Sequence, residues 1–350
     1  MTTLIIGGGL SGLALADALE RQGDDYLLIE ARDRFGGRIK TERHGDGYFD
    51  MGPAWFWDGQ PRIAALIQRL GLETFEQHTE GEMTFEDAQG HIQHGRGISA
   101  MKGSWRLEGG LTALTTALGA ALPNYRKRLN AQIQTLTREV DGITAVLSNG
   151  ERILGTRVVL ALPPRVATEI TFSPSLPTRT LSAMHAVPTW MAGQAKAVAI
   201  YDTPFWRNAG LSGDATSRRG PMVEIHDASP ATGGPYALFG FIGIPPEARR
   251  EEAVLRAHLN AQLARMFGTK AKTPLHLHIK DWALDPFTAI AADSAPMFTH
   301  PSYGLSPEFE NIWDGKLHFA GTEVAEEFGG YLEGALEAAQ NVFTTLRTSC

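Results

Sequence analysis

A glycine-rich turn near the start of the chain constrains the fold more than any other feature of the sequence. A short apolar run, Thr3–Ile6, leads directly into Gly7-Gly8-Gly9-Leu10-Ser11-Gly12, which has the spacing G-x-G-x-x-G. Apolar residues then recur at helical spacing as far as Gly23, and a second apolar run covers Tyr26–Ile29. This order of strand, glycines, helix and strand is typical of a dinucleotide-binding α/β unit.

Each glycine of the turn has a physical task. Gly7 permits the tight turn, Gly9 lets the backbone approach a pyrophosphate, and Gly12 lets the helix pack closely on the sheet. The free N–H groups at the start of the helix then face the phosphates. Glu30 follows the second strand, where its carboxylate can accept hydrogen bonds from a ribose diol. This pattern does not separate FAD from NAD.

The residues after the second strand favour FAD. The sequence reads Glu30-Ala31-Arg32-Asp33-Arg34-Phe35-Gly36-Gly37-Arg38. An arginine next to two glycines is suited to reach back to the pyrophosphate with a charge-assisted, forked hydrogen bond. A solvent-exposed basic turn would explain Arg32 but not the cluster that ends in Arg38. Here the chain resembles the flavin-containing amine oxidases, which carry E-A-R-x-R-x-G-G-R at this place.

The resemblance continues along most of the chain, and it is closest to the monoamine oxidase branch. The matching segments are Asp50-Met51-Gly52-Pro53-Ala54-Trp55, Val158–Pro164, Lys196–Tyr201 with Pro204-Phe205-Trp206-Arg207, Phe319-Ala320-Gly321-Thr322-Glu323, and Gly329-Gly330-Tyr331-Leu332-Glu333-Gly334-Ala335. The chain is thereby identified as a compact, bacterial-type member of that family. The resemblance implies bound FAD. The cofactor-binding residues that it implies are Gly7, Gly9, Leu10, Ser11, Gly12, Glu30, Ala31, Arg32, Gly37, Arg38, Gly52, Pro53, Ala54, Trp55, Ile133, Trp282, Gly321, Thr322, Glu323, Gly330, Tyr331 and Leu332.

The expected fold is a two-domain α/β flavoprotein, in which a Rossmann-type FAD-binding domain is interleaved with a reduced, mixed-sheet substrate domain. An apolar share of 43% is enough to build both cores. Residues 1–59, 104–166 and 284–350 are assigned to the FAD domain, and residues 60–103 and 167–283 to the substrate domain. The segment between Gln60 and Gly109 is shorter than in relatives, which predicts a more open or differently covered active site.

Lys196 is the first catalytic candidate. Its strand reads as buried on both faces, and a lysine in such a strand is unexpected because lysines are rarely buried without a partner. In the family, the equivalent lysine approaches flavin N5 through a water and assists reoxidation by O₂. The alternative is a lysine at a strand end that extends its ammonium to solvent.

Aromatic residues are expected around the reacting amine. The resemblance gives Tyr331 as one wall of an aromatic sandwich over the flavin, on a helix whose N-terminus faces the flavin, and Trp282 as a tryptophan packed against it. Trp55, Trp57, Phe328 and Tyr331 are assigned to the substrate pocket. Plain core packing remains an alternative for some of these aromatic residues.

Two departures from the monoamine oxidase pattern concern the flavin and the substrate. The family's Cys-Tyr pair is replaced by Ala291 and Ala292, which predicts non-covalent FAD and a half-open aromatic cage with room for a larger substrate. Trp55 stands where related L-amino acid oxidases place an arginine, so an amine without a carboxylate is expected. Polyamine specificity would need acidic residues in the pocket, and Glu80, Glu82, Glu326 and Glu327 are the candidates. Exposed acidic pairs are the alternative.

Charge and motifs exclude several other classes. A net charge of −7 argues against nucleic-acid binding, and the only cysteine, Cys350, rules out a disulfide within the chain. The sequence contains no long apolar stretch, H-E-x-x-H or G-x-S-x-G pattern, so no membrane span, metal site or hydrolase is expected. The sequence predicts a cytoplasmic enzyme, with a homodimer left open.

The predicted activity is amine oxidation: a neutral amine gives a hydride to flavin N5, the imine is hydrolysed to an aldehyde, and O₂ or another acceptor reoxidises the flavin, O₂ giving H₂O₂. Two alternatives stay open. One is a renalase-like or desaturase-type flavoenzyme that acts on a substrate other than an amine. The other is a flavin-bound, non-catalytic scaffold.

Overall fold

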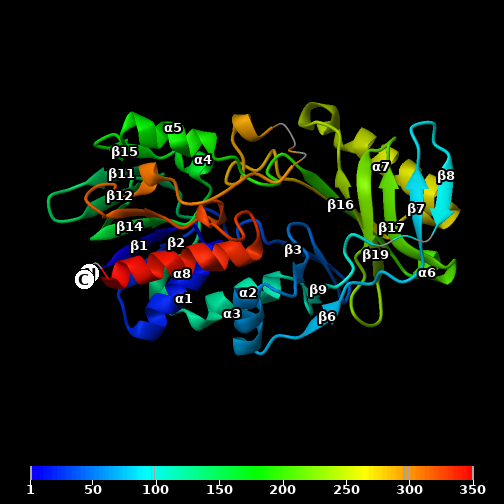
Figure 1. Cartoon of the computed structure of the whole chain (residues 1–350), viewed down its shortest axis with the longest axis horizontal. Coiled ribbons are helices and arrows are strands. Elements are labelled where there is room, and N and C mark those ends of the chain that lie inside the picture. The colour runs from blue at the N-terminus through cyan, green and yellow to red at the C-terminus, as the bar shows by residue number, and fades with distance from the viewer. Residues whose placement is uncertain (1, 96, 98, 295–296, 298, 349–350) are drawn as a thin grey trace.

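The computed structural model describes residues 2–95, 97, 99–294, 297 and 299–348; Cys350 lies outside these ranges. Two sheet systems lie side by side along the long axis of the molecule (Figure 1). The helices are α1 (Leu10–Gln22), α2 (Pro61–Arg69), α3 (Thr112–Ala121), α4 (Pro164–Ala167), α5 (Thr178–Ala186), α6 (Phe205–Asn208), α7 (Glu252–Phe267) and α8 (Leu332–Thr348).

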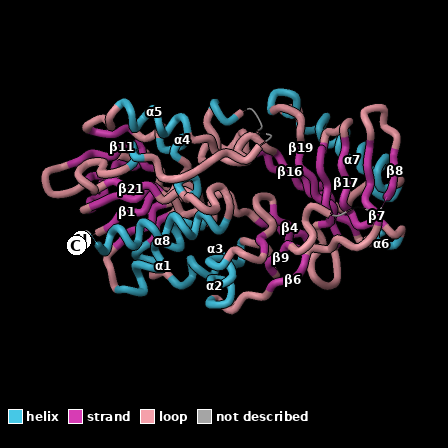
Figure 2. Tube along the Cα trace, in the orientation of Figure 1, coloured by secondary structure: helices cyan, strands magenta, loops and turns pink. Residues whose placement is uncertain are grey.

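The first sheet system has a five-stranded parallel sheet in the order β10-β2-β1-β14-β21. Its strands are β1 (Thr3–Ile6), β2 (Tyr26–Ile29), β10 (Lys127–Arg128), β14 (Arg157–Leu160) and β21 (Leu317–Phe319). Parallel strands need both faces covered. Helices α1, α3 and α8 cover one face, and a four-stranded sheet covers the other (Figure 2). That sheet consists of β11 (Ile133–Arg138), β12 (Ile143–Leu147), β13 (Arg152–Gly155) and β15 (Thr171–Ser173).

The second system is a seven-stranded mixed sheet in the order β20-β16-β19-β18-β17-β7-β8. Its strands are β7 (Glu82–Glu86), β8 (Ile92–Gly95), β16 (Ala195–Tyr201), β17 (Leu211–Ser217), β18 (Met222–Asp227), β19 (Tyr236–Ile242) and β20 (His276–Asp281). Helix α7 packs on one face, against Ala195, Ala197 and Ala199 of β16. Val198 and Ile200 point to the opposite face, so both faces of this strand are buried as the sequence predicts.

Smaller pairings connect the two systems. They are β3 (Thr41–His44) with β4 (Gly47–Asp50), and β5 (Phe56–Trp57) and β6 (Thr74–Glu76) on either side of β9 (Ser104–Leu107). The expected division at residues 60 and 167 cuts through packed elements. Helix α2 buries Ile63, Leu66 and Ile67 in the same core as α1 and α8, and β15 pairs with β11. Both segments therefore lie with the parallel sheet, because their apolar faces have their partners there.

Candidate active site

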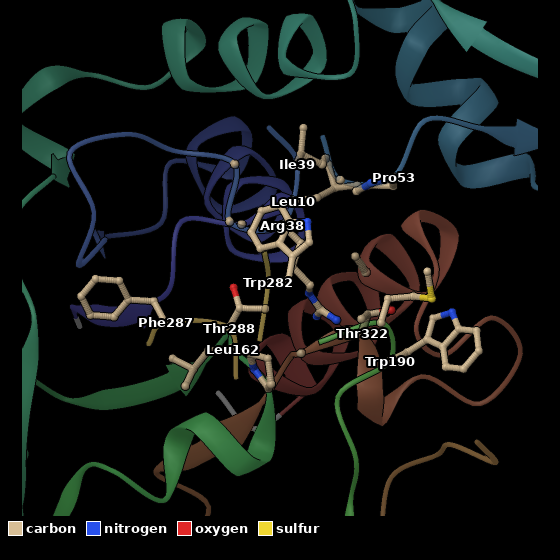
Figure 3. Close-up of a pocket in the computed structure, with 18 of the residues that line it drawn as sticks. Leu10, Arg38, Ile39, Pro53, Leu162, Trp190, Trp282, Phe287, Thr288 and Thr322 are labelled. Carbon is tan, nitrogen blue, oxygen red and sulfur yellow. The ribbon is translucent and has the colours of Figure 1, made fainter. Parts of the chain in front are cut away.

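A cavity of about 700 Å³ runs from the carboxyl ends of the parallel strands to one face of the seven-stranded sheet. Its walls come from segments far apart in the chain, including the glycine turn, the loop after β4, strand β16 and the start of α8. Figure 3 shows Arg38, Trp282 and Thr322 converging on it from three such segments. Ligands of open α/β folds bind at this edge of the sheet.

The glycine turn has the geometry that the spacing predicts. Gly7 has φ +107°, and a Cβ there would lie 2.5 Å from the carbonyl oxygen of Ala161. A Cβ on Gly12 would lie 1.9 Å from the Gly7 oxygen, whereas one on Gly9 would meet nothing within 4 Å. Helix α1 begins at Leu10 without a side-chain cap, so its first N–H groups remain available to an anion at the cavity wall.

Glu30 lies at the end of β2, on the cavity wall, and is only 3% exposed. Its carboxylate accepts hydrogen bonds from the backbone N–H of Gly8, at 2.6 Å, and of Arg32, at 2.9 Å. The Arg32 guanidinium is in turn held by Asp285 and by the Thr288 hydroxyl. The acid that the sequence assigns to a ribose is thus fixed against the glycine turn.

Arg38 is held from behind by a buried carboxylate. Glu323 is fully buried and lies 2.6 Å from a guanidinium nitrogen of Arg38. Burial opposes the charge of Arg38, but Glu323 outweighs it and raises the pKa of the guanidinium. The Arg34 guanidinium donates to the carbonyls of Gly37 and Ile39 and so fixes the loop that carries Arg38. Arg38 itself lines the cavity.

These groups fit a flavin dinucleotide. A helix N-terminus and an arginine converge where a pyrophosphate needs donors, a fixed acid lies where a ribose needs acceptors, and Ile133 adds an apolar wall. The cavity then continues past this polar end to the aromatic residues of the second sheet system.

Lys196 lies at that second end, 3% exposed, and lines the cavity. Its Nζ donates to the carbonyl oxygen of Gly52 at 3.1 Å and lies 4.0 Å from the centre of the Phe239 ring. Burial lowers the pKa of this amine from 10.5 to about 7, although Asp50 nearby favours the charged form. The alternative of a lysine that reaches solvent is therefore wrong.

Three tryptophans expected at the site line the cavity. The Trp282 indole N–H donates to the Met51 carbonyl at 2.9 Å, which fixes the ring against the loop after β4. The Trp55 indole N–H donates to the Gln77 side chain at 2.9 Å, and Trp55 lies beside Lys196. Trp57 lines the cavity as well.

Tyr331 lies on the wall just before α8 and is 40% exposed. Its ring stacks on His300, with centroids 4.8 Å apart and planes 12° apart. His300 also makes an edge contact with Trp190, a cavity residue that the sequence analysis did not identify. Tyr331, His300 and Trp190 therefore form an aromatic cluster at the cavity wall, next to the start of α8.

Three expected site residues do not line the cavity. Gly12 supports the turn from behind, Glu323 acts through Arg38, and Phe328 lies in the loop that Glu337 holds through backbone N–H groups. The acidic candidates Glu80, Glu82, Glu326 and Glu327 are also absent from the wall.

Sequence reasoning missed one acidic residue that does line the aromatic end. This is Glu224 on β18, which accepts a hydrogen bond from the buried His226. Its signal in the sequence was the alternation Glu224-Ile225-His226 along a strand, which places both polar side chains on one face.

Two absences concern only the described part of the chain. Within it, no helix is long and apolar enough to cross a bilayer. Among the same residues, no group of three or more His, Cys, Asp or Glu side chains is arranged to hold a metal ion.

The fold and the site define a flavin-dependent oxidoreductase. A model of the flavin containing amine oxidoreductase family matches residues 10–100 and 94–342. The chain belongs to this family: it is an FAD-dependent enzyme that oxidises amines. The resemblance inferred from the sequence motifs is confirmed.

Relatives of the same kind match along most of their length. A putative flavin-containing monoamine oxidase, AofH, of Mycobacterium tuberculosis is 27% identical, over 96% of this chain and 94% of that protein. A probable flavin-containing monoamine oxidase A of Dictyostelium discoideum is 24% identical, over 97% and 96%. A putrescine oxidase triple mutant (TM-score 0.84, 22% identity, 100% of both chains) and a cyclohexylamine oxidase from Brevibacterium oxydans IH-35A (TM-score 0.81, 20% identity, 99% of both chains) share the fold.

Proposed function

We propose that this enzyme is an amine oxidase with non-covalent FAD, which takes a neutral amine without a carboxylate and uses O₂ as its acceptor. The observation that carries the proposal is Lys196, buried on the wall of the aromatic end of the cavity with a pKa of about 7. Bound FAD supplies the acceptor for a hydride from the carbon next to the amine nitrogen and later passes two electrons to O₂.

The polar end of the cavity holds the cofactor in this proposal. Arg38 and the first N–H groups of α1 bind the pyrophosphate, and Glu30 binds a ribose. The only cysteine of the chain is Cys350, and alanines stand at 291 and 292, so we assign no thioether to the flavin. Acid precipitation tests this point: the flavin should leave the protein pellet completely.

The aromatic end selects the form of the amine. Trp55, Phe241 and Trp282 line this end, and a low-polarity wall disfavours a charged ammonium. Among the described residues, Lys196 is the only lysine or arginine that lines this end, and it is already bonded to Gly52. A substrate carboxylate would therefore find no arginine, which favours amines over amino acids.

Lys196 then acts as a proton carrier. With a pKa of about 7, its Nζ exists in both protonation states at neutral pH, so it can take up and release a proton without leaving its position. Reduction of O₂ to H₂O₂ consumes two protons and passes through anionic oxygen species. A cationic Nζ in a buried site stabilises those species.

An anaerobic titration with a panel of amines tests the function. We expect one class of amine to bleach the flavin absorbance, and H₂O₂ to appear when air is admitted. Bleaching with slow recovery in air would instead indicate a dehydrogenase with another acceptor. A flavin that no amine bleaches would overturn the proposal and favour a renalase-like, desaturase-type or scaffold role.

A further inference from the structure

The aromatic end of the cavity contains one acidic side chain that the oxidation of a simple amine does not require. Glu224 lines the cavity, and its side chain is 38% exposed. The other acidic residues on the wall are remote from Lys196 in the fold: Glu30 belongs to the nucleotide end, and Glu169 follows α4. Among the described residues, Glu224 is therefore the carboxylate that a molecule bound at the aromatic end, beside Lys196, would contact.

The strand register fixes where Glu224 stands relative to Lys196. Phe241 on β19 is paired with Lys196 of β16 on one side and with Glu224 of β18 on the other. Residues paired across neighbouring strands point to the same face of the sheet. Two strand spacings separate the Cα atoms of Lys196 and Glu224 by about 10 Å. The two side chains thus flank one phenylalanine on the cavity face.

A buried histidine holds the carboxylate in place. The Nε2 atom of His226 lies 2.6 Å from Oε1 of Glu224, and its Nδ1 atom lies 2.7 Å from Oδ1 of Asp214. Burial disfavours a charged imidazole, but the two carboxylates outweigh it and raise the pKa of His226. Hydrogen bonds at both ring nitrogens fix the orientation of the ring, because rotation would break both of them.

The cluster of Asp214, His226 and Glu224 has two carboxyl groups around one imidazole, so its acidic groups outnumber its basic group. The second oxygen of Asp214 is buried and has no hydrogen-bond partner among the described residues. The arginines of the wall, Arg32 and Arg38, belong to the nucleotide end and have their own acids. Glu224, the member of this cluster on the cavity wall, is therefore the carboxyl group that can bind a cation there.

Aromatic faces add to this attraction. Trp55 packs edge-on against His226, with ring centroids 5.3 Å apart, and Phe241 lies between Glu224 and Lys196 in the register. Ring faces attract ammonium groups, more strongly when water is excluded. A cation beside Glu224 would have a carboxylate on one side and aromatic carbon on the other.

We infer that Glu224 binds a second cationic group of the substrate, so that the preferred substrates are α,ω-diamines or polyamines, with His226 and Asp214 as positioning residues. The inference rests on the proposed function, since the first amine must be the one that is oxidised. One ammonium stays charged beside Glu224, while the reacting amine loses its proton at the Lys196 end.

The test compares matched amines on two variants of the holoenzyme. Butylamine against 1,4-diaminobutane, and hexylamine against 1,6-diaminohexane, differ only in the second amine. In the wild type we expect kcat/KM to favour one diamine over its monoamine. Glu224→Gln should reduce that preference about 10- to 100-fold, the usual loss for a hydrogen bond to a charged group, mainly through KM. Glu82→Gln, at an exposed residue of β7 in the same sheet that does not line the cavity, should leave the preference unchanged.

Further variants separate binding from misfolding. His226→Gln should weaken the diamine preference, mainly through the KM of the diamine, and Glu224→Asp should keep more of the preference than Glu224→Gln does. Inhibition of the wild type by a bis-quaternary ammonium alkane, compared with its mono-quaternary counterpart, gives a readout in which the test cation is not itself oxidised and no variant is needed. Equal inhibition by the two, or equal kcat/KM for monoamines and diamines, would overturn the inference and leave amine oxidation standing. Failure of every amine to bleach the flavin would overturn the proposed function itself.

Discussion

The two ends of the cavity are built in different ways. The nucleotide end is the polar end, with the glycine turn and Arg38, and the amine end is the aromatic end, with Lys196. At the nucleotide end, most of the site is backbone. Tight contacts fix the glycine turn and the start of α1, and Glu323 holds the side chain of Arg38. At the amine end, side chains from β16, β18 and β19 meet only through strand pairing. At the nucleotide end, few substitutions are compatible with these contacts. At the amine end, side chains on the strands can be replaced, and the substrate preference changed, without altering the fold.

The largest expected effect comes from Arg38→Met, which would leave Glu323 buried without its partner. Breaking such a buried pair typically costs about 3–5 kcal/mol, and the flavin would lose a pyrophosphate ligand as well. Urea unfolding and flavin content measure the two losses separately. The double variant Arg38→Met/Glu323→Gln should recover stability but not flavin. Recovery of flavin in the double variant would contradict the assignment of Arg38 to the cofactor.

A pair of glycine substitutions separates folding from cofactor binding. In Gly12→Ala the new Cβ would lie 1.9 Å from a backbone oxygen, so we expect a loss of about 3 kcal/mol, at the upper end for overpacking. Gly9→Ala meets no protein atom and should keep the unfolding midpoint while weakening flavin binding. Equal behaviour of the two variants in urea would contradict the distinction between a packing glycine and a contact glycine.

Lys196→Met probes the amine end. The variant should keep its flavin, because Lys196 lies away from the pyrophosphate ligands, and should reoxidise about 100-fold more slowly, the lower range for loss of a positioned proton-transfer group. Stopped-flow mixing of the reduced protein with O₂ measures the rate. Lys270→Met, at an exposed lysine that does not line the cavity, is the control. Unchanged oxygen kinetics in Lys196→Met would remove this residue from the mechanism.

The same lysine predicts a pH dependence. Its ammonium form is present below about pH 7 and is lost above it, so the O₂ rate constant should fall as the pH rises through about 7. In the unfolded chain the proton is kept to a much higher pH, so this group makes the free energy of unfolding rise with pH above about 7. Both trends should be absent from Lys196→Met. A rate that rises with pH in the wild type would mean that the neutral amine is the active form.

The smallest effect on catalysis is expected for the stacked pair of His300 and Tyr331 at the cavity wall. His300→Ala removes the ring stacked on Tyr331, but both residues are partly exposed to solvent, so KM should change by no more than about threefold. Stability and flavin content should stay at wild-type values. A large fall in kcat would show that the stack orients Tyr331 toward the reacting amine, and would raise His300 to a positioning residue.

The sequence predicts the nucleotide end well because its determinants are local. The glycine spacing, Gly23 as the helix stop and Glu30 after β2 lie within one continuous segment, and their geometry follows from it. Lys196 could also be predicted, since a lysine in a strand that is apolar on both faces is visible without knowing its partners.

The remaining site depends on contacts that sequence spacing does not encode. Glu224 faces Lys196 only because β18 pairs with β19 in one particular register. For the same reason, the sequence did not show that Glu323 acts by holding Arg38, which is far away in the chain. Nor did it show that Phe328 lies in a loop outside the cavity wall. The position of α2 beside α8 likewise follows from tertiary packing, with Glu333 accepting the N–H of Ile63.

The order of strands in the parallel sheet has a consequence for biosynthesis. Its edge strand β21, the acid Glu323 and helix α8 all come from the last part of the chain, although the glycine turn that they complete is made first. A nascent chain on the ribosome therefore carries the flavin motif long before it carries the residues that secure it. We therefore expect stable flavin binding only after Glu323 and α8 have been synthesised and have packed against the glycine turn.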